Sequence, residues 1–282
     1  MVRCKFNYKN KGGILPMHYQ KVLHSETAPW VLFIHGLGGS MKTWKYQLDK
    51  FSDKYNILLV DLEGHGKSSN EKTTERYKPA IDAEKIYNIL IKENISKIHL
   101  ISLSLGTLVA FEFVRLFPEV ISSAVFAGTI INLDLKRKIL LGFVQTIKRI
   151  VPVAILYKIF ANIILPRKNH KKSREIFIRE SKKLNKPVFL DWVRSMSQCH
   201  KYEKDYMAAI NNIHKKGVKT LFISGEEDYM FLKGAKNLNK KISEFAIKII
   251  QKCGHVCSIE KANIFNETIL KFIEKKELNE TH

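Results

Sequence analysis

A serine, a histidine and an aspartate occupy positions where together they could transfer an acyl group. Ser104 lies in the segment Ser-Leu-Ser-Leu-Gly, between an apolar run and a segment with helical spacing. A serine on a sharp strand-to-helix turn exposes its hydroxyl and has the N-terminus of the next helix behind it. The pattern is therefore compatible with a nucleophilic serine. The alternative is that Ser104 caps the helix that follows it.

The candidate general base for this serine is His255. It follows Gly254 directly after the last apolar run of the sequence. A serine hydroxyl is a weak nucleophile until such a base accepts its proton. Two of the other histidines, His35 and His65, are rivals because they also stand next to glycines. Their surroundings favour turn packing for His35 and the ordering of a loop for His65.

A carboxylate is expected beside the histidine, because it fixes the tautomer and stabilises the imidazolium. Asp228 closes the segment Gly-Glu-Glu-Asp after another apolar run and is the candidate. Glu226 and Glu227 precede it directly and compete for the same role.

Acyl transfer also needs backbone N–H groups that stabilise the oxyanion, each by about 3 kcal/mol. Leu105 is expected to supply one of them, because it follows Ser104. The other is expected at Leu37, in the glycine-rich turn His35-Gly-Leu-Gly-Gly39. The alternative for this turn is a simple tight loop.

The candidate residues follow short apolar runs that are typical of β-strands buried on both faces. Such strands form parallel sheets covered by helices, and ligands bind outside their carboxyl ends. Strands are predicted at residues 30–34, 56–60, 97–101, 120–126, 218–224 and 245–250. Helices of this core are predicted at residues 41–52, 79–94, 105–117 and 264–274.

A helical segment interrupts this alternation. Residues 133–205 contain no strand-like run, and prolines at 152, 166 and 187 punctuate them. Amphipathic helices are predicted there at residues 136–150, 153–165, 173–184 and 187–200. The predicted organisation is a core of residues 1–132 and 206–282 with a helical insertion, residues 133–205.

The motifs, in this order, resemble the α/β-hydrolase fold superfamily. The matching segments are residues 35–39, 61–68, 102–106, 117–120, 225–228 and 254–255, followed by a tail through Glu260. The resemblance implies an α/β fold with a mostly parallel central sheet flanked by helices and with an inserted helical cap. Three positions depart from the family pattern: Ser102 and Thr107 replace glycines, and Ala262 stands where proline is frequent.

The resemblance also implies roles for the candidate residues. Ser104 is the nucleophile, Asp228 the acid and His255 the base, in the chain order of the family. Leu37 and Leu105 donate to the oxyanion. No metal and no organic cofactor is implied.

The function implied is a serine hydrolase that cleaves a carboxylic ester or thioester with a hydrophobic acyl group. A first alternative is a carbon–carbon hydrolase or lyase similar to the menaquinone-pathway SHCHC synthase. Residues 228–231 resemble that enzyme, but Thr107 and Leu108 stand where its arginine is often found. A second alternative is a ligand-sensing regulator with low turnover.

Charge is concentrated in the insertion. The chain has 48 Lys and Arg residues against 27 Asp and Glu, a net charge of +21. Residues 133–205 hold 18 of the basic residues and 6 of the acidic ones. We favour a solvated outer face of a cap. The alternative is a basic, amphipathic lid that contacts an anionic membrane or steers an anionic substrate. Nucleic acid is not an expected partner, because no recognisable binding module is present.

Composition bounds the remaining classes. At 45% hydrophobic residues the chain is too apolar to be disordered, and no apolar run reaches the roughly 18 residues of a membrane span. The first residues lack the apolar core of a signal peptide. Four cysteines are too few for a disulfide scaffold, so reduced thiols and a cytoplasmic location are expected. Cys253 and Cys257 lack a second ligand cluster, so packing is favoured over zinc binding.

Overall fold

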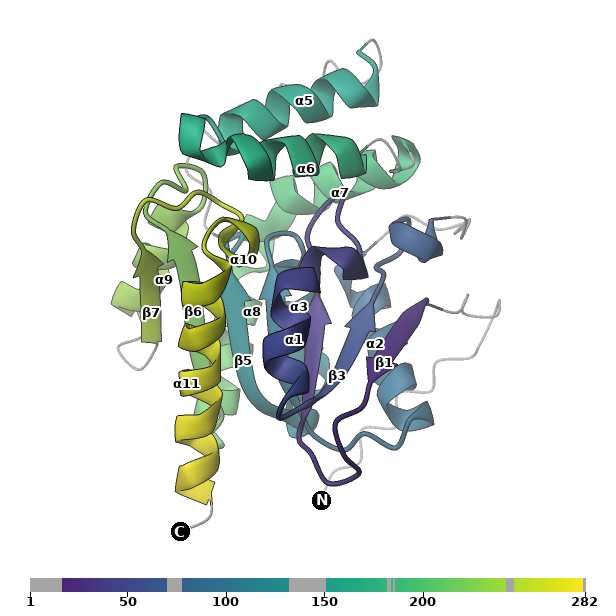
Figure 1. Cartoon of the computed structure of the whole chain (residues 1–282), viewed down its shortest axis with the longest axis vertical. Coiled ribbons are helices and arrows are strands. Elements are labelled where there is room, and N and C mark those ends of the chain that lie inside the picture. Colours follow the sequence, from purple (N-terminus) through teal and green to yellow (C-terminus); the bar gives the residue numbers. More distant parts are fainter. Residues whose placement is uncertain are drawn as a thin grey trace.

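A seven-stranded β-sheet forms the centre of the computed structural model, which describes residues 17–69, 78–131, 151–181, 184, 186–241 and 246–280. The strand order is β1-β3-β2-β4-β5-β6-β7, and only β1 runs antiparallel to its neighbour (Figure 1). The strands are β1 (Tyr19–Val22), β2 (Trp30–Ile34), β3 (Asn56–Val60), β4 (Ile98–Leu103), β5 (Ile121–Ala127), β6 (Lys219–Gly225) and β7 (Ala246–Ile250). The predicted, mostly parallel sheet is confirmed.

The central strands are buried along almost their whole length, which explains their continuous apolar runs. Every residue of β3 and β4 is buried. The edge strand β1 was not predicted. None of its four residues is fully buried, and it pairs with β3 in the register Tyr19 opposite Val60. A short, half-exposed edge strand has neither the apolar run nor the length that makes a buried strand recognisable.

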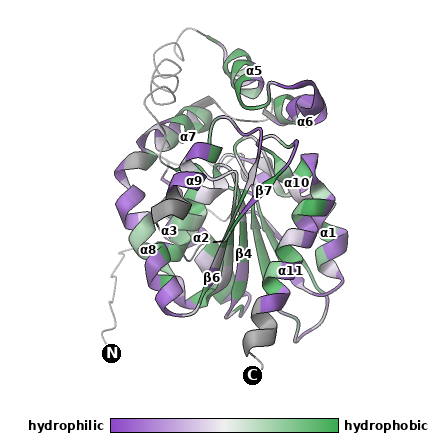
Figure 2. Ribbon diagram, turned by 90° about the vertical axis from the view of Figure 1, so that its left-hand side faces the viewer, coloured by the Kyte–Doolittle hydropathy of each residue, from purple (hydrophilic) through white to green (hydrophobic). Residues whose placement is uncertain are grey.

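Helices cover both faces of the sheet (Figures 1 and 2). One face carries α1 (Lys45–Ser52) and α11 (Ala262–Glu280), and the other carries α2 (Pro79–Lys92), α3 (Gly106–Leu116) and α8 (Glu203–Lys215). Aromatic rings fill both layers. Phe33 packs on Trp44 at a centroid distance of 4.8 Å, and Phe126 packs on Phe111 at 4.6 Å. The core also includes α9 (Leu232–Lys241) and α10 (Cys257–Glu260).

Helix α8 is an element that the sequence prediction omitted. Tyr206, Ala209, Ile210 and Ile213 are buried on it. Their spacing follows one face of a helix, so the periodicity was present in the sequence.

The helices between β5 and β6 lie above the carboxyl ends of the strands (Figure 1). They are α5 (Val153–Ile164), α6 (Lys171–Ser181) and α7 (Lys186–Gln198), close to three of the predicted ranges. The fourth predicted helix, residues 136–150, lies outside the described residues, and the boundaries at 133 and 205 stay predictions. Within the described ranges, no helix combines the length and the hydropathy needed to cross a membrane.

Candidate active site

Ser104 occupies the turn between β4 and α3. Its φ is +52°, in the left-handed region that a residue with a side chain rarely adopts. The turn is tight, because a Cβ atom on Gly106 would lie 2.5 Å from the backbone oxygen of His35. A glycine is therefore required there. The turn places the Ser104 hydroxyl at the carboxyl edge of the sheet.

The structure brings Ser104, His255 and Asp228 into one chain of hydrogen bonds. His255 Nε2 lies 2.7 Å from Ser104 Oγ, and His255 Nδ1 lies 2.8 Å from Asp228 Oδ2. Because the carboxylate accepts a hydrogen bond from Nδ1–H, Nε2 is left to accept one from the serine hydroxyl. The capping alternative does not describe this geometry, since Leu105 is the N-cap residue of α3 and Ser104 Oγ faces the imidazole.

The two competing carboxylates have other partners. Glu226 accepts a hydrogen bond from the backbone N–H of Lys252 at 3.1 Å. Glu227 contacts Arg167 and His170, on the segment between α5 and α6. Asp228 is thus the member of this run that faces His255.

The two rival histidines are buried and form hydrogen bonds with backbone atoms. His35 donates from Nδ1 to the oxygen of Gly36 at 2.8 Å and accepts from the N–H of Leu62 at 3.1 Å. His65 donates from Nδ1 to the oxygen of Glu63 at 2.9 Å. Burial lowers the pKa of His35 to about 4 and that of His65 to about 3. Both order loops as neutral side chains, which agrees with the roles that their sequence context favoured.

The turn that contains Leu37 lies beside Ser104. In the described part of the chain, the N–H groups of Leu37 and Leu105 donate to no other atom. The hydroxyl of Tyr157, on α5, donates to the oxygen of Leu37 at 2.6 Å. Gly38 follows with φ +69°, and a Cβ there would lie 2.1 Å from the Tyr157 hydroxyl. Helix α5 therefore holds this turn in place.

The departures from the family pattern have local explanations. Ser102 is fully buried and donates to the oxygen of Val125 at 3.0 Å. Thr107 donates to the oxygen of Ser104 at 2.6 Å and accepts from the N–H of Ile130 at 3.2 Å. Both hydroxyls thus replace glycine hydrogens without leaving a polar atom unpaired. Ala262 is the first residue of α11, a position at which proline and other residues are both tolerated.

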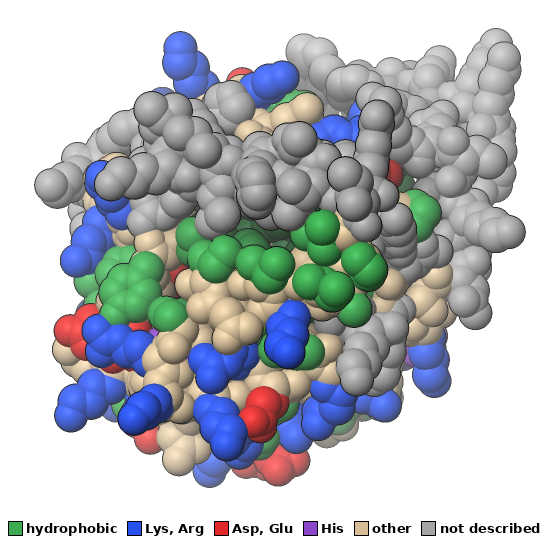
Figure 3. Space-filling model, turned by 90° about the horizontal axis from the view of Figure 1, so that it is seen from above, with side chains coloured by type: hydrophobic (Ala, Val, Ile, Leu, Met, Phe, Trp, Pro, Cys, Tyr) green, Lys and Arg blue, Asp and Glu red, His purple; other side chains and the backbone are tan. Residues whose placement is uncertain are grey.

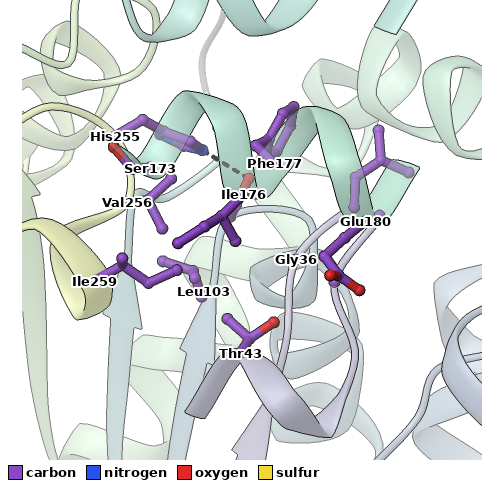
Figure 4. Close-up of a pocket in the computed structure, with 14 residues that line it drawn as sticks. Gly36, Thr43, Leu103, Ser173, Ile176, Phe177, Glu180, His255, Val256 and Ile259 are labelled. Carbon is purple, nitrogen blue, oxygen red and sulfur yellow. Dashed lines mark hydrogen bonds between the residues drawn. The ribbon is translucent and has the colours of Figure 1, made fainter. Parts of the chain in front are cut away.

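A narrow pocket of about 50 Å³ adjoins Ser104 and His255. Residues of α6 form its upper wall (Figure 4): Ser173, Ile176, Phe177 and Glu180. Apolar side chains dominate the rest, and no Lys or Arg of the described chain lines it. Neither Tyr157 nor any residue of α6 was predicted to contribute to the site. The sequence showed the helical periodicity of these segments. Periodicity does not reveal which side chains of a helix reach a pocket.

Comparison with known proteins establishes the family. The family model of the alpha/beta hydrolase fold matches residues 29–262. The chain belongs to this family, which confirms the resemblance.

Two curated relatives align with most of the chain. Epoxide hydrolase 1 of Caenorhabditis elegans is 22% identical over 275 residues, which are 92% of this chain and 68% of that protein. A putative 2-succinyl-6-hydroxy-2,4-cyclohexadiene-1-carboxylate synthase of Bacillus subtilis is 22% identical over 254 residues, 86% of this chain and 89% of that protein. Among solved structures, MGS-M2, an alpha/beta hydrolase from a Medee basin deep-sea metagenome library, superposes with a TM-score of 0.76. It is 22% identical and covers 92% of this chain and 94% of its own.

Proposed function

We propose that the chain is a serine hydrolase that cleaves a carboxylic ester or thioester with a hydrophobic acyl group. The observation that carries the proposal is the hydrogen-bonded series Ser104–His255–Asp228, with distances of 2.7 and 2.8 Å. A nucleophile, a base within reach of its proton and a carboxylate that orients the base are the parts of an acyl-transfer site.

In the first half of the proposed reaction, Ser104 Oγ bonds to the carbonyl carbon while its proton moves to His255 Nε2. The carbonyl electrons move to the oxygen and give a tetrahedral oxyanion. As the carbonyl re-forms, the bond to the alcohol or thiol breaks, and His255 returns the proton to that leaving group. Asp228, fully buried, stabilises the imidazolium between these steps. The product is an acyl-enzyme on Ser104.

In the second half, water gives a proton to His255 Nε2 and attacks the acyl carbon. The intermediate collapses, the carboxylic acid leaves, and Ser104 regains its proton from His255. The unbonded N–H groups of Leu37 and Leu105 suit the oxyanion in both halves. Each such donor contributes about 3 kcal/mol of transition-state stabilisation.

The pocket supports an apolar acyl group. Leu103, Ile176, Phe177, Val256 and Ile259 contribute apolar walls. Its volume of about 50 Å³ is several times the roughly 10–15 Å³ that a cavity needs to hold one water molecule. A short acyl chain fits this volume.

Epoxide hydrolysis is less compatible with a serine nucleophile. Attack of Ser104 Oγ on an epoxide carbon would form an ether, and an ether has no carbonyl at which water could attack to release the enzyme. An acyl-serine, in contrast, is hydrolysed by the same base that formed it. The similarity to Epoxide hydrolase 1 therefore supports the shared fold, and it does not support epoxide hydrolysis by this chain.

The synthase relative offers a second candidate reaction, and the pocket argues against it. The product named for that relative carries two carboxylates. In the described part of the lining, Glu180 is a carboxylate and no Lys or Arg is present. Like charges repel without a cation between them. An ester with an uncharged acyl group fits this lining better.

The test is labelling and turnover of purified protein. Wild type is expected to react with a fluorophosphonate and to hydrolyse short p-nitrophenyl esters. Ser104→Ala should lose labelling and lower kcat by about 10⁴-fold or more. Ser195→Ala, a serine on α7 outside the pocket lining, should match wild type.

Two results would overturn the proposal. The first is hydrolysis that persists in Ser104→Ala. The second is a wild-type protein that binds ester analogues, as judged by a thermal shift, but releases no product at steady state. That second result identifies a ligand-sensing regulator.

A further inference from the structure

A cluster of buried polar side chains joins the inserted helices to the two loops that carry Asp228 and His255. We infer that His170, in this cluster, is a positioning residue that keeps both loops in the geometry of the reaction. The inference rests on the proposed function, because it concerns the same site.

His170 belongs to the short 3-10 turn η4 (Lys168–His170), between α5 and α6. Its side chain is fully buried. Nδ1 accepts the backbone N–H of Arg167 at 3.4 Å, so Nε2 carries a proton. Nε2 lies 2.7 Å from a carboxylate oxygen of Glu227 and 3.7 Å from one of Glu260. One N–H of the insertion thus points between two carboxylates of the core.

Glu227 connects the cluster to the acid. It directly precedes Asp228 in the chain, and its own N–H donates to the oxygen of Cys253 at 2.8 Å. Besides His170, Arg167 and Asn169 donate to its carboxylate at 2.5 and 2.9 Å. The hydrogen bonds from Asn169 and His170, together with the positive charge of Arg167, lower the pKa of Glu227 below its usual value. The insertion therefore holds an ionised carboxylate next to the acid.

Glu260 connects the cluster to the base. Its carboxylate accepts the N–H of Gly254 at 2.7 Å and that of Val256 at 3.0 Å. These two residues flank His255. The imidazole of His170 also packs on this turn, since a Cβ on Gly254 would lie 2.9 Å from its Nε2. The backbone of Gly254 and Val256 sets the orientation of the His255 ring, and Glu260 and His170 both contact this backbone.

The contacts of His170 lead to the loops that carry the reacting side chains. A residue that only anchored the insertion would not need contacts there, so we assign His170 a positioning role. Without the His170 donor, the carboxylates of Glu227 and Glu260 would face each other with one fewer hydrogen bond. Their two loops carry Asp228 and His255, so a separation of the loops changes the distances from His255 to its partners. A misplacement of about 1 Å costs roughly 100-fold in rate.

The experiment compares three variants of the full chain in ester hydrolysis and in proton NMR. His170→Leu removes the donor and should lower kcat about 10- to 100-fold while KM changes by less than about twofold. His170→Gln carries an N–H that can reach Glu227 and should recover most of kcat. Lys168→Ala, an exposed position on the same turn, is the control and should match wild type. If His170→Leu does not fold, Glu227→Gln tests the same contact and should also lower kcat.

A second readout does not depend on turnover. The Nδ1 proton of His255, bonded to Asp228, should give a far-downfield proton resonance that is absent in His255→Gln. The His170→Leu change should shift or broaden it at temperatures well below unfolding, and His170→Gln should restore it. The inference is overturned if His170→Leu lowers only the melting temperature and leaves kcat and this resonance unchanged. If wild type itself lacks Ser104-dependent hydrolysis, the proposed function fails, and the resonance alone decides the role of His170.

Discussion

Ser104 combines an unfavourable backbone angle with hydrogen bonds that hold it there. A left-handed conformation costs about 1–2 kcal/mol for a residue with a side chain. Against this, the N–H of Ser104 donates to the oxygen of Ala127 at 2.8 Å. Its own oxygen accepts from both the N–H and the hydroxyl of Thr107. The surrounding elements thus determine the angle, as expected where strain is kept at a functional position.

The residue types of the site could be predicted from the sequence, and Asp228 was predicted to be the acid. Glu226, Glu227 and Asp228 are consecutive carboxylates after the same strand, so the two glutamates competed for the same role on sequence alone. Which of them faces His255 depends on the turn after β6, where Asp228 N–H bonds to the oxygen of Gly225. This backbone path has no local sequence signature. The same holds for the donors to Glu227, namely Arg167 and His170, which lie 60 and 57 residues away in the chain.

We predict that burial of His65 makes the free energy of unfolding sensitive to acid. Burial lowers the pKa of His65 from 6.5 to about 3 in the folded chain. Between these values the unfolded chain binds a proton that the folded chain does not. The free energy of unfolding therefore falls as pH falls, by about 1.4 kcal/mol per pH unit for one such group. Urea unfolding of wild type and His65→Gln at pH 6.5 and 5 measures this slope.

The His65→Gln variant should lose that part of the slope, even if its stability at pH 6.5 is lower because ring contacts are gone. His24→Gln replaces an exposed histidine and should keep the wild-type slope. Equal slopes in wild type and His65→Gln would contradict the assignment of His65 as a neutral buried residue.

At the scale of elements, the buried parallel strands were predictable and the contacts of the insertion were not. The runs of β3 and β4 are mostly apolar because both faces are covered. Helix α5 is equally apolar, but its functional contact is one hydroxyl, Tyr157, on a turn 120 residues earlier in the chain. Such a contact depends on how α5 lies over the sheet, which periodicity does not determine.

The contact between α5 and the Leu37 turn leads to a prediction with a matched control. Gly38 and Gly217 both have positive φ, +69° and +77°. A Cβ on Gly38 would lie 2.1 Å from the Tyr157 hydroxyl, whereas one on Gly217 would meet nothing within 4 Å. Gly217→Ala should therefore cost only the backbone preference, about 1 kcal/mol. Gly38→Ala should in addition displace Tyr157 or the Leu37 turn.

The measurement is fluorophosphonate labelling beside thermal unfolding. Both variants should unfold at lower temperature than wild type, but Gly38→Ala alone should label at least about tenfold more slowly, because an oxyanion donor is misplaced. Similar labelling rates for the two variants would show that the turn tolerates movement.

At the scale of the whole molecule, exposed lysines occur on the helices over the site, including Lys158 on α5 and Lys171 and Lys172 on α6. Figure 3 shows Lys and Arg side chains spread over this face, with hydrophobic side chains between them. On α5, Ile155 and Ile159 are 50% and 46% exposed, one helical turn apart, and the exposed Lys158 lies between them in sequence. Exposed apolar side chains among lysines are typical of a helix that contacts an anionic lipid surface.

We therefore expect the chain to bind vesicles that contain phosphatidylserine at low salt and to leave them at high salt, because the lysines act through a screened field. Each lysine near such a surface contributes about 1 kcal/mol, so Lys158→Gln should lower partitioning about fivefold in co-sedimentation. Ile155→Ser with Ile159→Ser should lower it further, by removing apolar area. Ile91→Ser, at an isoleucine on α2 that is 60% exposed, is the control and should bind as wild type does. Equal binding to neutral and anionic vesicles, or a loss with Ile91→Ser as large as with the α5 pair, would contradict a lipid-facing α5 and leave the charge as a solvated outer face.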